Sequence, residues 1–261
     1  MKPSRDRVSG DGIVPLLLIN DSAGPIARSV IDLALLLDAI DSVEIEYAAG
    51  LVPDALKDVR VGVLASDLAA EGGNNDVLDR IASTLILAGA VVTPAWLEDT
   101  TGSLDRFTDL LSGGMRYDMM PHVATLHPEI DSPEALIAYN AAEPDRRIPF
   151  GQDSFAAISA TSANMSRVAF VAMGEALSAA ATAALEATFA ATGADVLVSI
   201  DNVHATFYAT AGYPAITVPL GTRSGGGIAE QLGLDAAGMP VGVTLIGKKG
   251  EDDKLIGYAF A

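Results

Sequence analysis

Cysteine is absent from this 261-residue chain. Without thiols the chain can form no disulfide or Cys-ligated metal centre, and it cannot use a thiolate nucleophile. Basic residues are also scarce: 16 Lys and Arg stand against 34 Asp and Glu, which gives a formal net charge of −18. Such a chain repels phosphate backbones and anionic lipid headgroups, so the composition argues against nucleic-acid binding and against attachment to a membrane surface.

Long uninterrupted apolar runs are missing as well. No stretch reaches the roughly 18 apolar residues that a membrane span needs, because the Ala-rich run over 169–191 carries Glu175 and Glu186. We interpret this run as a buried helix of a folded domain. The first residues lack the apolar core of a signal peptide, which predicts a cytoplasmic location. Half of the residues are apolar and 19% are charged, as expected of a globular domain.

Apolar periodicity in the first hundred residues predicts alternating helices and strands. Ser29 is placed to cap a helix that runs through Ile40. Its apolar face is expected to comprise Ile31, Leu35, Leu36 and Ala39. A strand over 59–64, a helix over 75–88 ended by Gly89, and a strand over 90–93 stopped by Pro94 follow. This order is typical of an α/β sheet with parallel strands.

The rest of the chain predicts further strands around one long helix. Residues 96–153 have little regular pattern apart from a short helix over 133–142. A long helix over 154–192, with a break near Gly174, precedes a central strand over 194–200. Strands over 213–219 and 241–247 complete the sheet, joined through a hairpin loop at 224–227. We expect one domain over residues 1–261.

Several segments occur together in an order typical of one enzyme family. They are the opening residues 2–9, the segments 11–16 and 21–30, and the strands at 213–219 and 239–247. Together they resemble the amidase-signature family, and residues 132–152 are similar to its branch of peptide amidases. The resemblance implies an α/β/α sandwich around a mixed β-sheet, here incomplete on its N-terminal side. Asp6 departs from the pattern, because the family usually has glycine there, and the backbone at Asp6 is expected to be either strained or rerouted.

The motif residues favour structural roles. Gly24-Pro25 predicts a turn before a helix, Asp21 and Arg28 are expected to hydrogen-bond around it, and prolines are tolerated at strand ends. The resemblance gives Lys2 a structural role. The structural set is Lys2, Asp21, Gly24, Pro25, Arg28, Tyr213, Pro214 and Pro219.

The resemblance also implies a reaction. Members hydrolyse carboxylic amides with a serine nucleophile, a bridging serine and a lysine base, and they need no cofactor. In the family pattern these groups all precede the position of Lys2, so we expect the C-terminal portion of such an enzyme, with no catalytic residue and no activity alone. The alternatives are a non-catalytic scaffold or subunit, and an amidotransferase subunit that releases ammonia. An incomplete sheet also predicts self-association through an exposed edge.

The segment after the predicted central strand holds the candidate pocket residues. Loops at the carboxyl ends of strands in α/β sheets contact ligands, and in the family the corresponding loop borders the substrate pocket. The candidates for contacting a small amide substrate are Asp201, Asn202, His204 and Tyr208. The alternative is a helix-capping loop with an incidental histidine. No metal site is predicted, because the spacing of His122, His127 and Asp131 matches no familiar ligand pattern.

Overall fold

The computed structural model describes residues 1–65, 75–222 and 238–261. The predicted hairpin loop at 224–227 lies outside these residues. Contacts between Cα atoms divide the chain into two compact units. Unit 1 comprises Met1–Ser9, Ser22–Glu98 and Ala181–Ala261, and unit 2 comprises Gly10–Asp21 and Asp99–Ala180. The expectation of a single domain stays a prediction.

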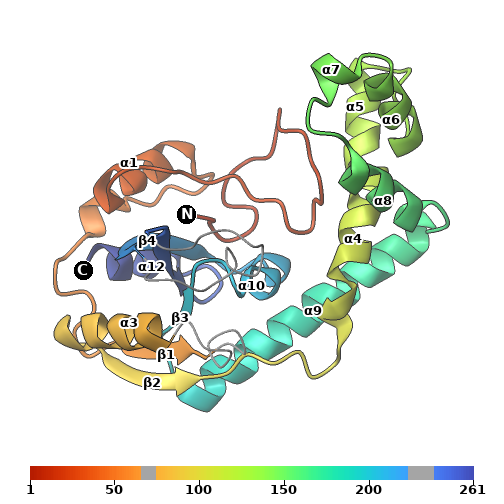
Figure 1. Cartoon of the computed structure of the whole chain (residues 1–261). Coiled ribbons are helices and arrows are strands. Elements are labelled where there is room, and N and C mark those ends of the chain that lie inside the picture. The colour runs from red at the N-terminus through yellow and green to blue at the C-terminus, as the bar shows by residue number, and fades with distance from the viewer. Residues whose placement is uncertain (66–74, 223–237) are drawn as a thin grey trace. The chain divides into compact units, whose positions relative to one another are not determined.

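Unit 1 is built on a five-stranded mixed sheet (Figure 1). The strand order is β2-β1-β3-β5-β4; β2, β1 and β3 run parallel, and β5 is antiparallel to both β3 and β4. All five residues of β3 are buried, as expected of a central strand. The strands are β1 (Arg60–Leu64), β2 (Val91–Ala95), β3 (Val196–Ile200), β4 (Ala215–Thr222) and β5 (Pro240–Ile246). The α/β prediction with a mixed sheet is therefore confirmed.

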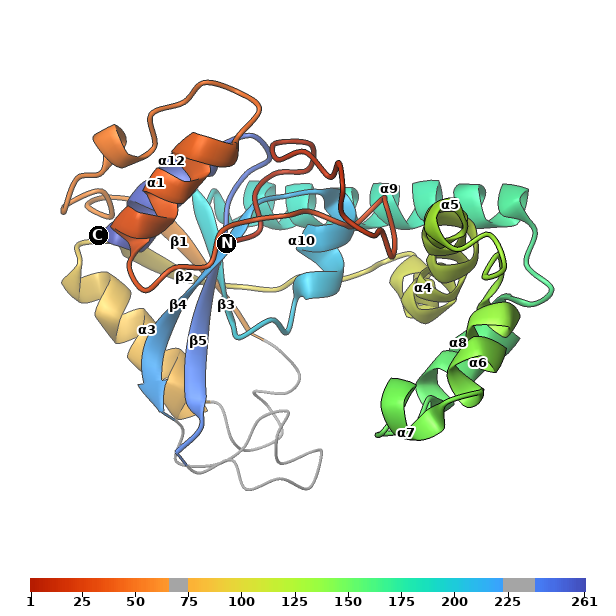
Figure 2. The ribbon, with the colours of Figure 1, turned by 90° about the horizontal axis from the view of Figure 1, so that it is seen from above.

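Three helices supply the apolar core that packs on this sheet (Figure 2). They are α1 (Val30–Ile40), α3 (Asn75–Leu87) and α12 (Asp252–Phe260), and two shorter segments are η1 (Ala48–Gly50) and α10 (Ala205–Ala211). Leu37, Ile81 and Ile256 lie in one buried cluster with Val61 and Val198 of the sheet. Burial of such a side chain stabilises the fold by roughly 1.5–3 kcal/mol.

The predicted helix at α1 forms, but the predicted apolar face was wrong. Ser29 caps it by accepting a hydrogen bond from the Asp32 amide at 3.1 Å. Leu33, Ala34 and Leu37 are the buried residues, whereas Ile31, Leu35 and Leu36 are exposed. The helix is apolar nearly all round, so its 3.6-residue period offers two apolar faces and does not choose between them.

Two prolines lie inside strands rather than at their ends. Pro94 is the fourth residue of β2, which it was expected to stop. Pro219 lies within β4, where the register shifts between Pro219 and Gly221. Within the described part of the chain, both strands are at the edges of the sheet, where one side of the backbone has no strand partner and proline is tolerated. Self-association through an edge stays a prediction, and proline in an edge strand opposes it.

Unit 2 is helical, so the expectation of little regular structure over 96–153 was wrong. Its first helices follow each other almost without interruption, because α4 continues through a π-helical segment, η3, into α5. The predicted short helix appears as α6, with Ser132 as its N-cap. The elements are η2 (Ser103–Arg106), α4 (Phe107–Gly114), η3 (Met115–Met119), α5 (Met120–Leu126), α6 (Pro133–Ala141), α7 (Pro144–Arg147) and α8 (Asp153–Ser162).

The long helix breaks earlier than predicted. Helix α9 covers Arg167–Thr192 without interruption at Gly174. The break lies between α8 and α9, where the Ser166 hydroxyl accepts a hydrogen bond from the Ala169 amide at 3.1 Å and so caps the new helix. A Cβ at residue 174 would approach Ile19 to 3.3 Å and Leu110 to 3.5 Å. Close packing within unit 2 thus accounts for this glycine.

Helix α9 is long and apolar enough, by length and composition, to cross a membrane. Its most apolar 18-residue window has a mean hydropathy of 1.6 and is 44% buried inside the fold. The buried residues Met173, Leu177, Ala181 and Leu185 recur at helical spacing, as in the core helix of a globular protein. The predicted cytoplasmic location stays a prediction.

The backbone at Asp6 is left-handed, with φ of 69°. Asp6→Gly is therefore expected to raise the free energy of unfolding by about 0.5–1 kcal/mol, because glycine adopts positive φ without a Cβ clash. Chemical denaturation measures the change. The control is Asp54→Gly, since Asp54 is also exposed but is not among the residues with positive φ. A loss of stability in both variants would contradict the prediction.

Candidate functional site

The carboxyl end of β3 brings together the residues singled out in the sequence. Ser199 is on the strand, Asp201 and Asn202 form the turn after it, and His204 precedes α10. Parallel strands β1 and β3 end at this edge of the sheet, which is where α/β folds place ligand-binding loops. The four candidates thus lie on one loop and the short helix that it leads into.

His204 is held against the sheet by Ser199. The ring is 7% exposed, and its Nδ1 lies 2.6 Å from the Ser199 hydroxyl oxygen, which is itself fully buried. Burial lowers the pKa of His204 to about 4, so the ring is neutral at pH 7. The pair looks like a nucleophile beside its base, but a serine with no exposed surface cannot reach a substrate.

Asp201 fastens the turn to β5. Its backbone is left-handed, with φ of 48°. Its carboxylate accepts a hydrogen bond from the Gly242 amide at 2.8 Å, and its own amide donates to the Gly242 carbonyl at 2.8 Å. The Thr244 hydroxyl donates to the Asp201 carbonyl, and the Thr244 and Thr217 hydroxyls lie 2.8 Å apart. The structure gives Asp201 a bracing role in this turn.

The other two candidates differ in exposure. Asn202 is exposed at the tip of the turn. Tyr208 is 8% exposed and lies one helical turn beyond His204 in α10, and burial raises its pKa. The sequence reasoning missed Ser199, although a hydroxyl within a strand of buried apolar residues must find a partner and so could have been noticed.

Lys2 joins the start of the chain to β4. Its backbone exchanges two hydrogen bonds of 2.8 Å with Ala215, and its ammonium donates to the carbonyls of Pro3 at 2.8 Å and Tyr213 at 2.9 Å. Burial, followed by the nearby charge of Arg5, lowers the pKa of Lys2 to about 8. An ammonium bound by two carbonyls is engaged in the fold rather than presented to a ligand.

Asp252 is a second residue that the sequence reasoning missed. This fully buried carboxylate accepts hydrogen bonds from the Ser4 amide at 2.7 Å and the Ser4 hydroxyl at 2.5 Å. The Ser4 hydroxyl oxygen also accepts from the Gly250 amide at 2.9 Å. The contact ties residues 248 positions apart, so no local pattern could reveal it.

The Gly24-Pro25 turn requires glycine because of a close approach. A Cβ on Gly24 would lie 2.2 Å from the Met1 carbonyl oxygen. The Pro25 carbonyl accepts a hydrogen bond from the Met1 amino group at 2.8 Å. Arg28 is exposed and has no hydrogen bond or ion pair among the residues that the structure describes. Its predicted role as a donor stays a prediction.

The remaining motif residues take part in backbone contacts. Asp21, in unit 2, accepts hydrogen bonds from the amides of Leu16 at 2.8 Å and Leu17 at 3.0 Å, rather than from the Gly24-Pro25 turn. Tyr213 is buried and stacks on Phe189 with ring centroids 6.5 Å apart. The Pro214 carbonyl accepts from the Gly247 amide at 3.0 Å, which ties the start of β4 to the end of β5.

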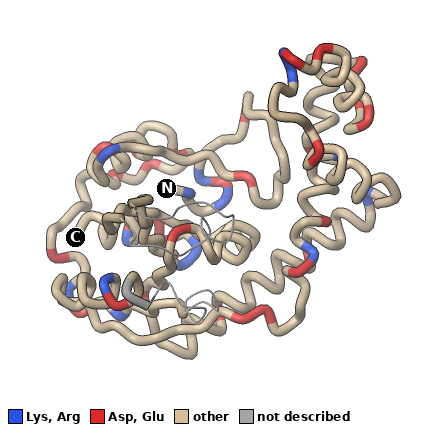
Figure 3. The backbone as a smooth tube through the Cα atoms, in the orientation of Figure 1, with Lys and Arg blue, Asp and Glu red and all other residues tan. Residues whose placement is uncertain are grey.

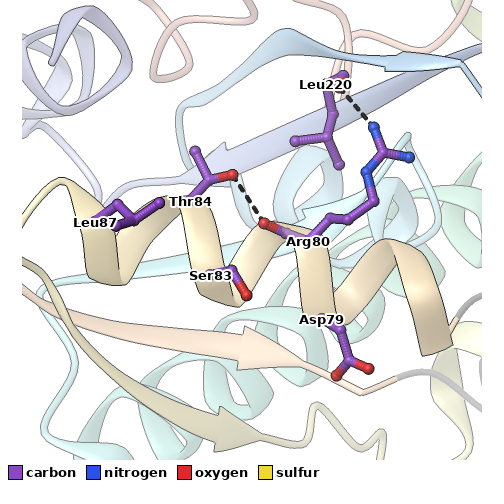
Figure 4. A pocket seen from close by; sticks show the side chains of 6 residues that line it. All are labelled: Asp79, Arg80, Ser83, Thr84, Leu87 and Leu220. Carbon is purple, nitrogen blue, oxygen red and sulfur yellow. Dashed lines mark hydrogen bonds between the residues drawn. The ribbon is translucent and has the colours of Figure 1, made fainter.

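A surface hollow on α3 is not a convincing site. The hollow has a volume of about 390 Å³ and is lined by Asp79, Arg80, Ser83, Thr84, Leu87 and Leu220 (Figure 4). Arg80 donates to the carbonyls of Leu220 at 2.8 Å and Thr222 at 3.3 Å, and Thr84 donates back to its own helix. The Arg80 guanidinium and the Thr84 hydroxyl of this hollow are therefore already hydrogen-bonded to backbone carbonyls of the fold.

In the described part of the chain, His122 and His127 are not grouped with two or more other side chains that could bind a metal ion. His122 lies in α5, not in an irregular stretch, and His127 lies at its C-terminal end, with Nδ1 3.4 Å from the Glu129 carboxylate. Over the described ranges, no three His, Cys, Asp or Glu side chains are grouped as metal ligands. These residues give no support to a metal centre.

Three relatives are informative. The chain is 28% identical over its whole length to a protein of Arabidopsis thaliana named "Probable amidase", of which it covers 51%. It superposes on the peptide amidase of Stenotrophomonas maltophilia with a TM-score of 0.83 at 26% identity, covering 99% of this chain and 56% of that one. An amidase family protein of Bacillus anthracis gives 0.81 at 28% identity, covering 100% and 51%. The chain spans about half the length of these relatives.

A shorter match is to one of the subunits of the glutamyl-tRNA(Gln) amidotransferase of Deinococcus deserti, at 37% identity over 98 residues, or 34% of this chain and 19% of that protein. The full-length likeness is to the peptide-amidase branch. The sequence model of the Amidase family matches residues 1–256, and the chain therefore belongs to the amidase-signature family.

Proposed function

We propose that this chain is the C-terminal portion of a hydrolase that cleaves the C–N bond of small carboxylic amides. The observation that carries the proposal is the agreement of fold with a peptide amidase over 99% of the chain, at a TM-score of 0.83. In such an enzyme a serine attacks the amide carbonyl and a lysine serves as its base. Residues 1–261 supply the five-stranded sheet, and the loop at the carboxyl end of β3 borders the substrate.

We further propose that the 261 residues alone do not hydrolyse amides. Ser199 is fully buried, and the ammonium of Lys2 is bound by two carbonyls. The Ser199 hydroxyl lies 2.6 Å from His204 Nδ1, as a nucleophile would lie beside its base, but the buried serine is closed to a substrate. No cofactor is proposed, since the serine–lysine reaction needs none.

We propose that Asn202, in the β3 loop, contacts the substrate directly. It is exposed at the tip of the turn, whereas Asp201 is bound to Gly242. In this arrangement Asp201 positions the turn, and Asn202 offers an amide donor and an amide acceptor. A neutral amide substrate suits a loop whose carboxylate is already engaged.

A chimera tests the proposed function. The N-terminal portion of the Stenotrophomonas maltophilia peptide amidase is joined to residues 1–261, and ammonia release from N-acetylphenylalaninamide is measured. The chimera is expected to turn over, and the 261-residue chain alone is expected to release no ammonia. The control chimera has the nucleophilic serine of the peptide amidase portion replaced by alanine. A folded chimera without amidase activity would contradict the family reaction, and ammonia release by the chain alone would contradict its inactivity.

Ammonia release for a partner enzyme is the second candidate function. The match to one of the amidotransferase subunits favours it, but that match covers 34% of the chain. Acidic residues occur along both units (Figure 3), and a chain with a net charge of −18 offers no attraction to a nucleic acid. Glutamine as a substrate of the same chimera separates the two, because an amidotransferase subunit would prefer glutamine to the peptide amide. A non-catalytic scaffold predicts that the chimera acts on neither.

A further inference from the structure

We propose that Ser199 is a positioning residue that fixes His204 in the Nε2–H tautomer, and that His204 thereby donates a hydrogen bond to a carbonyl oxygen of the amide substrate. The inference deepens the proposed function and rests on it for the nature of the ligand. Its structural half, the tautomer, is independent of any reaction. Ser199 acts through the ring and does not touch the substrate.

The short separation of the two atoms favours the Ser199 hydroxyl as the donor. The Ser199 oxygen and His204 Nδ1 are 2.6 Å apart. This separation is typical of an O–H donor at about 2.5–3.0 Å and is short for an N–H donor at about 2.7–3.2 Å. The other acceptor near the Ser199 hydroxyl is the Ile200 carbonyl, at 3.4 Å, which already accepts from the Val203 amide at 3.2 Å. We therefore assign Ser199 as the donor to Nδ1, which places the proton of the neutral ring on Nε2.

This assignment leaves Nε2–H in need of an acceptor. His204 is 93% buried, since 7% of its surface is exposed. Within the described residues its ring makes one hydrogen bond, to Ser199, and one tilted ring contact, with Phe207 at 6.4 Å between centroids. Nε2–H therefore has no hydrogen-bond partner among the described residues, and 7% of the His204 surface remains exposed. An unmade hydrogen bond of this kind is unfavourable, so water or a ligand must complete it.

A neutral carbonyl oxygen is the acceptor that fits best. The ring stays neutral because it is buried and no charged group contributes to its shift. An anionic ligand is disfavoured, because a neutral ring offers it no opposite charge and the chain carries a net charge of −18. The position at the carboxyl end of β3 is one from which α/β folds contact ligands.

The tautomer is read by nitrogen NMR of the chain labelled with 15N-histidine. His204 is assigned by the resonances lost in His204→Asn, and His122 and His127 are internal references. We expect Nε2 to carry the proton throughout pH 5–8. Ser199→Ala is expected to move the tautomer ratio toward Nδ1–H by about fivefold, which corresponds to roughly 1 kcal/mol for one hydrogen bond. Ser199→Thr keeps the hydroxyl and is expected to restore the ratio.

The proposed hydrogen bond from His204 to a substrate carbonyl is tested in the same NMR spectra. N-acetylphenylalaninamide is expected to shift the Nε2–H proton in the wild-type chain, and the shift should shrink in Ser199→Ala and return in Ser199→Thr. A wild-type ring protonated on Nδ1, or a ratio unchanged by Ser199→Ala, would overturn the positioning role. An Nε2–H proton that responds to N-acetylphenylalanine carboxylate but not to the amide would overturn the choice of ligand. Failure of the chimera to turn over leaves the tautomer measurement intact, so the two proposals fail separately.

Discussion

Replacing Asp252 by alanine is expected to lower the free energy of unfolding by about 3 kcal/mol, since hydrogen bonds to a charged acceptor each contribute about 1.5–3 kcal/mol. The buried carboxylate accepts both the amide and the hydroxyl of Ser4. In the variant these two donors lose their acceptor in a place that water does not reach, because Ser4 is 3% exposed. The substitution thus removes the two hydrogen bonds that tie the start of the chain to α12.

Asp253→Ala is the matched control. Asp253 is the next residue of α12, carries the same charge in the same first turn and is exposed. Its effect is expected to stay within about 0.5 kcal/mol, as for most surface substitutions. Urea unfolding followed by circular dichroism gives both values. Equal losses in the two variants would show that charge at the start of the helix, rather than the contact with Ser4, is what matters.

Acid is expected to destabilise the wild-type chain more than a His204→Asn variant. The pKa of His204 is about 4 in the folded state and about 6.5 in an unfolded chain. Between these values the unfolded state binds more protons, so the stability contributed by the neutral ring is present above pH 6.5 and is lost as pH falls toward 4. The full difference is about 3 kcal/mol at pH 4 and below.

The measurement is the free energy of unfolding of both proteins at pH 7 and pH 4.5. Carboxylates titrate in both, so the difference of the two pH effects isolates residue 204. The His127→Asn variant is the control, because its side chain is 58% exposed and it should keep the wild-type pH dependence. If His204→Asn also retains the full acid loss, the ring is not buried in its neutral form.

The amino-acid order decided which local elements form. Ser29 caps α1 where the sequence predicted a cap, and Gly89 ends α3 with φ of 89°. These outcomes depend on hydrogen bonds within a few residues, which a local pattern contains. The left-handed backbone at Asp6 belongs to the same group, because the glycine usual in the family pointed to it.

Where an apolar pattern was compatible with two arrangements, tertiary packing decided which one forms. The helix α1 has apolar residues on several sides, and the sheet selects Leu33 and Leu37 for burial. The break after α8 was placed too late, because Gly174 serves close packing rather than the end of a helix. Propensity is a weak preference that tertiary contacts override.

The candidate site divides in the same way. The sequence by itself determined the family, the α/β class and the loop after the central strand. Only the tertiary structure decided what that loop's residues do: Asp201 binds Gly242, and His204 binds Ser199. It also decided that Asp252 meets Ser4. The physical reason is that a buried polar group must find its partner in space, and a partner 41 or 248 residues away leaves no trace in the local order of the chain.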